Sequence, residues 1–447
     1  MRIVIAGAGE VGTHLARLLS NDDHNIIVLD EDAESLKRMS ASMDLMCVEG
    51  SPQSLVDLKR AEVYRADLFI GVTPYEERNI LSCMLAKQIG AARTIGRISS
   101  QEYLTEANRE LFRNMGVDVL ILPESLAAKE ISVSIKNVGT RQMIEFSGSN
   151  LILLGIKIRD NAQIVNKTMN ELHSMDGNIL CVAISRGHDT IIPTGKDMIK
   201  SGDIAFFMTT KDNELHVFEL AGKTIFDIKN IMFIGGSRIA QKAIERLGSH
   251  FNITVIEQDK DRCVKLAERL GDDVLVINGD GRHLELLKEE GIHDMDAIVA
   301  VTGNSETNIL CCSMAKNFGV KRTCAEIENI DFLSIAQSIG IGSIINKKKI
   351  SAGYIYRFTL DAEVIHVRYL TSTNAEVFEF IAKEKAKITT KKVKDICMPE
   401  GAIIGAAIRG NYGFLVNGDT QIEAGDKVVV FVKPESIKKV GKLFRAG

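Results

Sequence analysis

The sequence lacks the features that mark secreted, metal-binding or membrane-spanning proteins. None of its apolar runs approaches the roughly 18 to 20 residues that a membrane-spanning helix needs. Its eight cysteines include no CxxC pair and no Cys/His spacing typical of zinc sites, which indicates buried thiols in a reducing compartment. The amino-terminal run Met1–Gly7 is predicted to be a strand entering a glycine turn, since Glu10 interrupts any signal-peptide core. We therefore expect a cytoplasmic protein that acts at a membrane only through a partner.

The sequence also lacks an excess of charge of one sign. Its net charge is −4, with 26% charged and 45% hydrophobic residues, as in an ordinary folded cytosolic protein. Nothing in that balance predicts nucleic acid as a partner. The histidines form no HExxH motif and none of the seven tyrosines begins a YxxxK motif, so we predict neither a metal site nor a catalytic set.

What the chain does contain is repetition. Residues 70–87 reappear as residues 299–316, and residues 200–207 reappear as residues 423–430. A chain of 447 residues is too long for one core, and the repeats divide it into two long domains, each followed by a shorter domain that we call its C-lobe. The predicted bounds of these domains are 1–137, 138–225, 226–358 and 359–447.

Each long domain alternates short β-rich runs with segments of helical spacing, the pattern typical of a Rossmann domain. In the first, the runs are Arg2–Ala6, Ile26–Asp30, Leu45–Val48, Leu68–Val72, Thr94–Ile98 and Val117–Leu122. The intervening segments Val11–Leu19 and Ile80–Ile89 have apolar residues at helical intervals. This alternation predicts an α/β fold with a doubly wound parallel sheet. The C-lobes are richer in turns and are predicted to be small α+β domains, with one helix near Thr168–His173.

A glycine turn follows the first predicted strand and opens the first predicted helix. Its residues are Gly7, Ala8, Gly9, Glu10, Val11 and Gly12. In this context the GxGxxG spacing indicates a dinucleotide-binding turn. Gly7 permits the tight turn, Gly9 lets a pyrophosphate approach the backbone, and Gly12 lets helix and strand pack closely. The helix N-terminus would offer free N–H groups to the phosphates.

An acidic residue ends the second predicted strand, as ribose recognition requires. Asp30 stands where a carboxylate hydrogen-bonds ribose hydroxyls, and Glu31 and Asp32 follow it. Three carboxylates would repel a 2′-phosphate, so NADP is disfavoured against NAD. Because adenosine nucleotides such as ATP carry the same ribose hydroxyls, Asp30 does not discriminate between them and NAD.

The second Rossmann domain has a degenerate copy of this turn. Ser237 stands where Gly9 would be and Ala240 where Gly12 would be. A side chain at Ser237 would crowd an approaching pyrophosphate. Glu257 retains the ribose-binding acid, so a weak or altered second site remains possible.

With the tandem order, the glycine turn and the Thr73–Asn79 loop in view, the whole chain resembles the TrkA family, the peripheral subunits of Trk potassium-uptake systems. This family combines RCK (KTN) nucleotide-binding domains with TrkA-C domains. The resemblance implies a non-enzymatic regulator that binds NAD(H) or ATP/ADP and gates potassium uptake. It also implies a homo-oligomer, in the form of a tetrameric ring, peripheral on the inner face of the cell membrane beneath the pore-forming Trk subunit.

The resemblance also assigns further residues to the first site. It implies that Gly50 and Ser51 form the turn on the adenine side, that Thr73 ends the fourth strand at the ligand, and that Arg97 binds phosphate. The residue aligned with Arg97 in the second half is Glu326, which would repel phosphate. We therefore expect the first Rossmann domain to sense the ligand and the second chiefly to supply ring contacts.

Two other interpretations share parts of this argument. An NAD-dependent dehydrogenase would have the same first domain, but it would also need an acid or base poised at the nicotinamide, and the small C-lobes offer none that can be identified. A regulator of another transporter or channel, for chloride or sodium, would have the same nucleotide-sensing domains, because these domains do not identify the transported ion.

Overall fold

The computed structural model describes residues 1–20, 24–146, 148–187, 189–223, 226–359, 364–370 and 373–445. The predicted domain boundary at Ile225 lies outside the described residues. Within the described ranges, no helix is both long enough and apolar enough to cross a membrane. The chain forms two compact units, residues 1–127 with 347–359, and residues 128–346 with 360–447.

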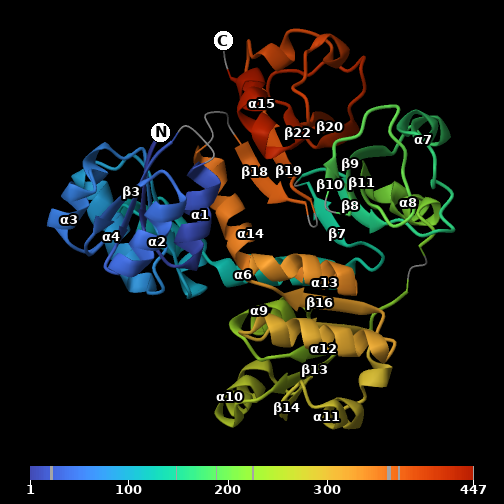
Figure 1. The fold of residues 1–447 in the computed structure, drawn as a ribbon, viewed down its shortest axis with the longest axis horizontal. Coiled ribbons are helices and arrows are strands. Elements are labelled where there is room, and N and C mark those ends of the chain that lie inside the picture. Colours follow the sequence, from blue (N-terminus) through green and yellow to red (C-terminus); the bar gives the residue numbers. More distant parts are fainter. Residues whose placement is uncertain are drawn as a thin grey trace. The chain divides into compact units, whose positions relative to one another are not determined.

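The first Rossmann domain is built on a six-stranded parallel sheet of order β3-β2-β1-β4-β5-β6. Its strands are β1 (Arg2–Ala6), β2 (Asn25–Asp30), β3 (Met46–Glu49), β4 (Leu68–Gly71), β5 (Thr94–Arg97) and β6 (Val119–Ile121). Its helices are α1 (Glu10–Ser20), α2 (Ala33–Ser42), α3 (Leu55–Arg60), α4 (Glu76–Ile89) and α5 (Glu106–Asn114) (Figure 1). The predicted doubly wound sheet is confirmed, with strand ends within two residues of those expected.

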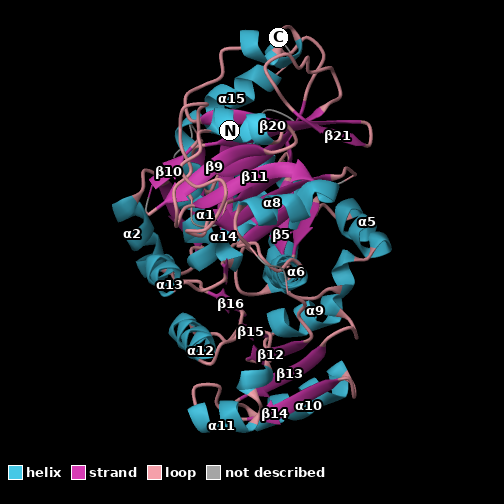
Figure 2. Ribbon diagram, turned by 90° about the vertical axis from the view of Figure 1, so that its right-hand side faces the viewer, coloured by secondary structure: helices cyan, strands magenta, loops and turns pink. Residues whose placement is uncertain are grey.

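The second Rossmann domain repeats this order as β14-β13-β12-β15-β16-β17. Its strands are β12 (Asn230–Ile234), β13 (Asn252–Glu257), β14 (Val274–Asn278), β15 (Ala297–Ala300), β16 (Arg322–Glu326) and β17 (Ser343–Ile345). Its helices are α9 (Arg238–Leu247), α10 (Lys260–Leu270), α11 (Leu284–Glu289), α12 (Ser305–Asn317) and α13 (Leu333–Ile339). Figure 2 shows α12 on one side of this sheet and α9 and α10 on the other.

The central strands of the two parallel sheets are buried because their side chains are apolar on both faces. In β1, Ile3, Val4 and Ile5 are fully buried, and Ile231, Met232 and Phe233 of β12 are equally so. A parallel sheet covered by helices on both faces needs such continuous apolar runs. Polar residues can therefore gather only where the strands end.

Each C-lobe is a five-stranded antiparallel sheet, β10-β9-β11-β8-β7 in the first and β18-β19-β22-β20-β21 in the second. The strands of the first lobe are β7 (Gln142–Glu145), β8 (Leu151–Lys157), β9 (Leu180–Arg186), β10 (Asp189–Ile191) and β11 (Ile204–Thr210), with helices α7 (Met169–Met175) and α8 (Glu214–Leu220). Those of the second are β18 (Val364–Tyr369), β19 (Glu376–Ile381), β20 (Ala402–Arg409), β21 (Tyr412–Leu415) and β22 (Lys427–Val432), with helix α15 (Ile437–Phe444). The two sheets share one core, in which Phe206 and Leu153 belong to the same cluster as Phe431 and Val377.

The shorter sequence repeat is explained by an ion pair between an arginine and a buried aspartate in each C-lobe. Asp203 accepts hydrogen bonds from Arg186 Nε at 2.9 Å and Nη2 at 2.8 Å. Asp426 accepts the same two bonds from Arg409, also at 2.9 and 2.8 Å. Both aspartates are buried. The repeated Gly-Asp is thus a structural element that closes the lobe.

The two halves exchange helices, which the sequence did not reveal. Helix α14 (Lys347–Tyr356), which follows the last strand of the second sheet, packs against α1 of the first Rossmann domain (Figure 1). Helix α6 (Pro123–Lys136) follows the first sheet, and its carboxyl-terminal half contacts the second Rossmann domain, where Ser134 Oγ lies 2.9 Å from Ser343 Oγ. The compact units are therefore discontinuous in sequence, and the domain bounds inferred from the repeats stay predictions.

Candidate functional site

The predicted glycine turn lies at the crevice where the strand order of the first sheet reverses. Strands β1 and β4 are neighbours there, although α1, β2, α2, β3 and α3 separate them in sequence. Gly7 has a φ of +120°, and a Cβ on it would lie 3.0 Å from the Thr73 amide nitrogen. The turn and the Thr73 loop thus meet at the carboxyl ends of the strands, where open α/β sheets bind ligands.

The three glycines of the turn differ in their surroundings. A Cβ on Gly12 would collide with the Gly7 carbonyl oxygen, so Gly12 allows helix α1 to pack on the turn. A Cβ on Gly9 would have no atom within 4 Å. The space beside Gly9 is therefore open, and Gly9 has no side chain that could cap α1. The first N–H groups of α1 can bind an anion there by donating hydrogen bonds to it.

Asp30 is held against the glycine turn. Its Oδ2 accepts a hydrogen bond from the Ala8 N–H at 2.5 Å, and its Oδ1 accepts one from the Asp32 N–H at 2.8 Å. Asp32 also caps helix α2 by accepting from the Ser35 N–H, and its hydrogen bonds with Ser35 lower the pKa of Asp32 below its ordinary value. Backbone hydrogen bonds thus hold the carboxylates of Asp30 and Asp32 in place beside the crevice.

A pocket with a volume of about 340 Å³ opens beside Asp30. Its lining residues are Asp30, Glu31, Asp32, Pro52, Thr73, Pro74, Tyr75 and Arg78. Tyr75 and Arg78 were not among the predicted site residues. The Arg78 guanidinium lies over the Tyr75 ring, 4.8 Å from its centroid, and 3.2 Å from Glu31 Oε2. One sequence signal could have pointed to Arg78. It lies in the repeated segment 70–87, and the second copy has Thr307 at the aligned position.

Gly50, Ser51 and Arg97 do not line this pocket. A Cβ on Gly50 would lie 2.6 Å from Asp57 Cγ, and the carboxylate of Asp57 accepts a hydrogen bond from the Ser51 N–H at 3.1 Å. Arg97 ends β5, where its Nη2 lies 3.8 Å from Glu124 Oε1. In this structure Arg97 is thus paired with a carboxylate.

The longer sequence repeat is explained by a buried asparagine. Asn79 accepts hydrogen bonds from the Thr73 N–H and the Thr73 hydroxyl, both at 2.8 Å. Its Nδ2 donates to the carbonyl oxygens of Thr73 at 3.0 Å and of Arg97 at 2.9 Å. Asn308 makes the same four bonds to Thr302 and Glu326. The repeat therefore preserves a tie between two strand ends, and it aligns Arg97 with Glu326.

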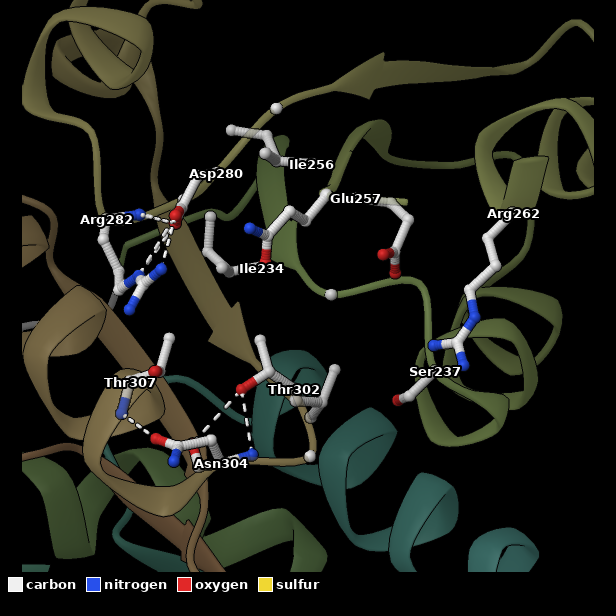
Figure 3. Close-up of a pocket in the computed structure, with 16 residues that line it drawn as sticks. Ile234, Ser237, Ile256, Glu257, Arg262, Asp280, Arg282, Thr302, Asn304 and Thr307 are labelled. Carbon is white, nitrogen blue, oxygen red and sulfur yellow. Dashed lines mark hydrogen bonds and ion pairs between the residues drawn. The ribbon is translucent and has the colours of Figure 1, made fainter. Parts of the chain in front are cut away.

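The second Rossmann domain has a pocket of about 410 Å³ in the corresponding crevice (Figure 3). Its lining includes Glu257, whose Oε2 accepts from the Gly236 N–H at 2.8 Å and whose Oε1 accepts from the Asp259 N–H at 2.9 Å. Ser237 caps helix α9, because its Oγ accepts a hydrogen bond from the Ala240 N–H at 3.4 Å. Space is thus available in both halves, and what differs is the chemistry at the helix N-terminus.

Two arginines flank the second pocket and have no counterpart in the first. In Figure 3, Arg262 and Arg282 lie on opposite sides of it. The Arg282 guanidinium pairs with Asp280 at 2.6 Å, and these hydrogen bonds lower the pKa of Asp280 to about 2. The aligned residues of the first half are Ser35 and Gln53. Within the described part of the chain, no group of three or more His, Cys, Asp or Glu side chains could hold a metal ion.

Comparison with known protein families defines the class of protein. Residues 3–123 and 231–347 match the TrkA-N domain, and residues 153–222 and 377–445 match the TrkA-C domain. The first is a nucleotide-binding fold, and here it is duplicated together with its companion.

Full-length relatives give the family. The chain is 30% identical over 454 residues to Trk system potassium uptake protein TrkA homolog 1 of Methanosarcina mazei, with both chains fully covered. It is also 30% identical over 454 residues to Trk system potassium uptake protein TrkA of Halomonas elongata, covering 99% of that relative. The chain therefore belongs to the TrkA family of potassium-uptake proteins.

A solved structure supports the same architecture. The GsuK channel bound to NAD superposes with a TM-score of 0.62, over 99% of this chain and 79% of that chain. The sequence identity is 16%, so this likeness supports the fold alone.

Proposed function

We propose that this chain is a nucleotide-sensing regulatory subunit that gates potassium uptake through a membrane Trk-type pore subunit. It binds NAD(H) or ATP/ADP in its Rossmann domains, chiefly in the first, and catalyses no reaction. The names of its relatives support the potassium-uptake system, and the GsuK channel bound to NAD supports a nucleotide as ligand.

One observation carries this proposal: the N-terminus of α1 is open at Gly9. A Cβ on Gly9 would meet no atom within 4 Å, and the ribose-type acid Asp30 is hydrogen-bonded to the same turn. A phosphate there would gain free N–H donors and the positive end of the helix dipole. The ribose of the same nucleotide would lie within reach of Asp30.

The second domain would bind less well or bind a different ligand. The hydroxyl of Ser237 already satisfies an N–H of α9, so a phosphate there would have to displace it. Glu326 replaces Arg97, so the end of β16 has a buried carboxyl group in place of a guanidinium. The hypothesis that the first domain senses the ligand rests on these two differences together.

Membership of the family supports a proposal about the partners and the location. We propose a homo-oligomer, as a tetrameric ring, that is cytoplasmic and lies peripherally on the inner face of the membrane under the pore subunit. Nucleotide binding would shift the ring between two conformations according to its difference in affinity for them. A coupling of roughly 1 to 3 kcal/mol would change uptake about five- to 150-fold.

The test uses a matched pair of substitutions in cells that carry a Trk-type pore subunit. Gly9→Val places a side chain in open space, so it should fold normally and collide only with a bound ligand. Ser237→Val makes the corresponding change in the second domain. We expect deletion of the chain to abolish potassium uptake at low external potassium, Gly9→Val to reduce it about tenfold or more, and Ser237→Val to have a smaller effect.

Two results would contradict the proposal. Uptake that does not depend on the chain would remove the potassium assignment and would favour a regulator of another ion transporter. Steady turnover of NAD(H) with any substrate would instead favour the dehydrogenase interpretation.

A further inference from the structure

Three consecutive lysines, Lys347 to Lys349, begin helix α14. The N-terminus of a helix carries the positive end of its dipole, so cations there are unfavourable by roughly 0.3 to 1 kcal/mol each. Sites where a local preference is broken are often functional. We therefore expect the lysine cluster to have a function in the region that α14 contacts.

Lys348 contacts the first residue of helix α1. Helix α14 packs along α1, and Lys348 Nζ lies 2.6 Å from Glu10 Oε2. Glu10 directly follows Gly9, the open position of the glycine turn. The ammonium group of Lys348, a residue from the second half of the sequence, thus contacts a residue of the glycine turn of the first Rossmann domain.

The burial of this ion pair is unequal. The Lys348 side chain is 11% exposed, whereas that of Glu10 is 73% exposed. A buried ammonium needs a counter-charge, but an exposed carboxylate can turn into water at little cost. Glu10 is therefore a partner that another anion can replace, and Lys348 would remain in place to bind that anion.

The positive field of the cluster covers the first turns of α1. His14, one turn after Glu10, has its pKa lowered to about 4, first by burial and then by the charges of Lys349, Arg17 and Lys348. The same field attracts a phosphate placed at the N-terminus of α1, where the N–H groups and the helix dipole act in the same direction.

The corresponding position in the first half has the opposite charge. Helices α6 and α14 each follow the last strand of their sheet, and their second residues are Glu124 and Lys348. The lysine is thus a feature of the second half alone, and it acts on the first nucleotide site.

We propose that Lys348 is a phosphate-binding residue of the first nucleotide site and that Glu10 is its partner when the site is empty. This inference rests on the proposed nucleotide binding at the glycine turn. The ligand would be an adenine nucleotide with a terminal phosphate, ADP or ATP, whose terminal phosphate replaces the Glu10 carboxylate. In NAD(H) both phosphates are bridged within the pyrophosphate, so Lys348 would contribute less to binding it. Lys348 would thereby determine specificity and connect the first site to α14.

The experiment measures dissociation constants of ADP, ATP and NADH for the full chain by isothermal titration calorimetry. We expect Lys348→Gln to weaken ADP and ATP about tenfold or more, Lys348→Arg to restore most of this loss, and NADH to change less than about threefold. Glu10→Gln should tighten ATP, because it removes the competing carboxylate. Lys265→Gln, which removes an exposed lysine on α10, is the matched control and should change none of the three.

The outcomes separate this inference from the proposed function. If the unmodified chain binds none of the three nucleotides, both fall. If it binds them and Lys348→Gln changes nothing, or weakens NADH as much as ATP, only the role of Lys348 falls. If Lys348→Gln fails to fold, Glu10→Gln decides: tighter ATP binding supports the inference, and unchanged binding overturns it.

Discussion

At the scale of single residues, the residues of the repeated motifs have structural as well as ligand-binding tasks. Asn79 and Asn308 tie neighbouring strand ends, Gly12 lets a helix pack on a turn, and Gly9 leaves an open space. Substitutions at residues that look alike in a motif therefore differ in their effects on stability and on ligand binding. Substituting the buried asparagines should destabilise the fold, whereas substituting Gly9 should affect the ligand.

Replacing Asn79 with alanine should loosen the Thr73 loop. The change leaves the Thr73 N–H and two carbonyl oxygens without their partner, at a cost of about 2 to 3 kcal/mol. Hydrogen exchange of the Thr73 amide should accelerate roughly 30-fold or more. Asn114→Ala, at the exposed end of α5, is the control. Unchanged exchange at Thr73 would mean that the tie is unimportant.

His14 should make the stability of the first compact unit depend on pH. Its folded pKa of about 4 lies below the ordinary value of 6.5, so the unfolded chain binds the proton more readily. Stability is then complete above pH 6.5 and falls as pH drops toward 4, by up to about 3 kcal/mol. Titration of the His14 ring by NMR measures this pKa directly. A value near 6.5, or an unchanged pH dependence in His14→Leu, would contradict it.

At the scale of elements, local sequence marks where several helices of this chain begin. Asp32 caps α2, Ser54 caps α3 (Leu55–Arg60), and Thr168 forms a capping box with Glu171 at α7. Continuous apolar runs define the buried parallel strands. The C-lobes add an ion pair that holds strand to loop, and its repetition in both lobes allows a paired test.

Removing the buried charge of this ion pair should destabilise each C-lobe to a similar extent. Asp203→Asn and Asp426→Asn both remove a buried carboxylate that accepts two hydrogen bonds from an arginine, at a cost of about 2 kcal/mol, although Arg409 keeps its ion pair with Glu423. Thermal denaturation should show comparable decreases in Tm for both variants. Asp212→Asn, an exposed aspartate of the same lobe, should change little. A loss in only one lobe would mean that the two pairs are not equivalent.

At the scale of the whole molecule, the exchange of helices makes the two halves of the sequence interdependent. The first compact unit includes residues 347–359, more than 200 positions away from the rest of it. Helix α14 follows β17 of the second Rossmann domain in sequence and packs on α1 of the first, so it joins the two halves of the sequence. The exchange also means that the predicted domains should not be independent in stability.

A fragment of residues 1–136 should be less stable than the same fragment joined by a flexible linker to residues 347–359. The added helix packs on α1, and burial of two or three apolar side chains contributes about 3 kcal/mol or more. Circular dichroism during thermal denaturation compares the two fragments. Equal Tm values would show that α14 contributes nothing to the first unit, and a scrambled 347–359 segment controls for length.

The sequence by itself determined the fold class, the order of strands and helices, and the residues at the strand ends, because apolar periodicity, glycine spacing and repetition are local patterns. It also placed Asp30 and Thr73 at the crevice where a pocket lies. Only the tertiary structure decided that Tyr75 and Arg78 line that pocket, that Arg97 pairs with Glu124, and that Lys348 lies at Glu10. The physical reason is that these contacts join residues from separate elements, and their approach depends on how helices pack, which no local pattern encodes.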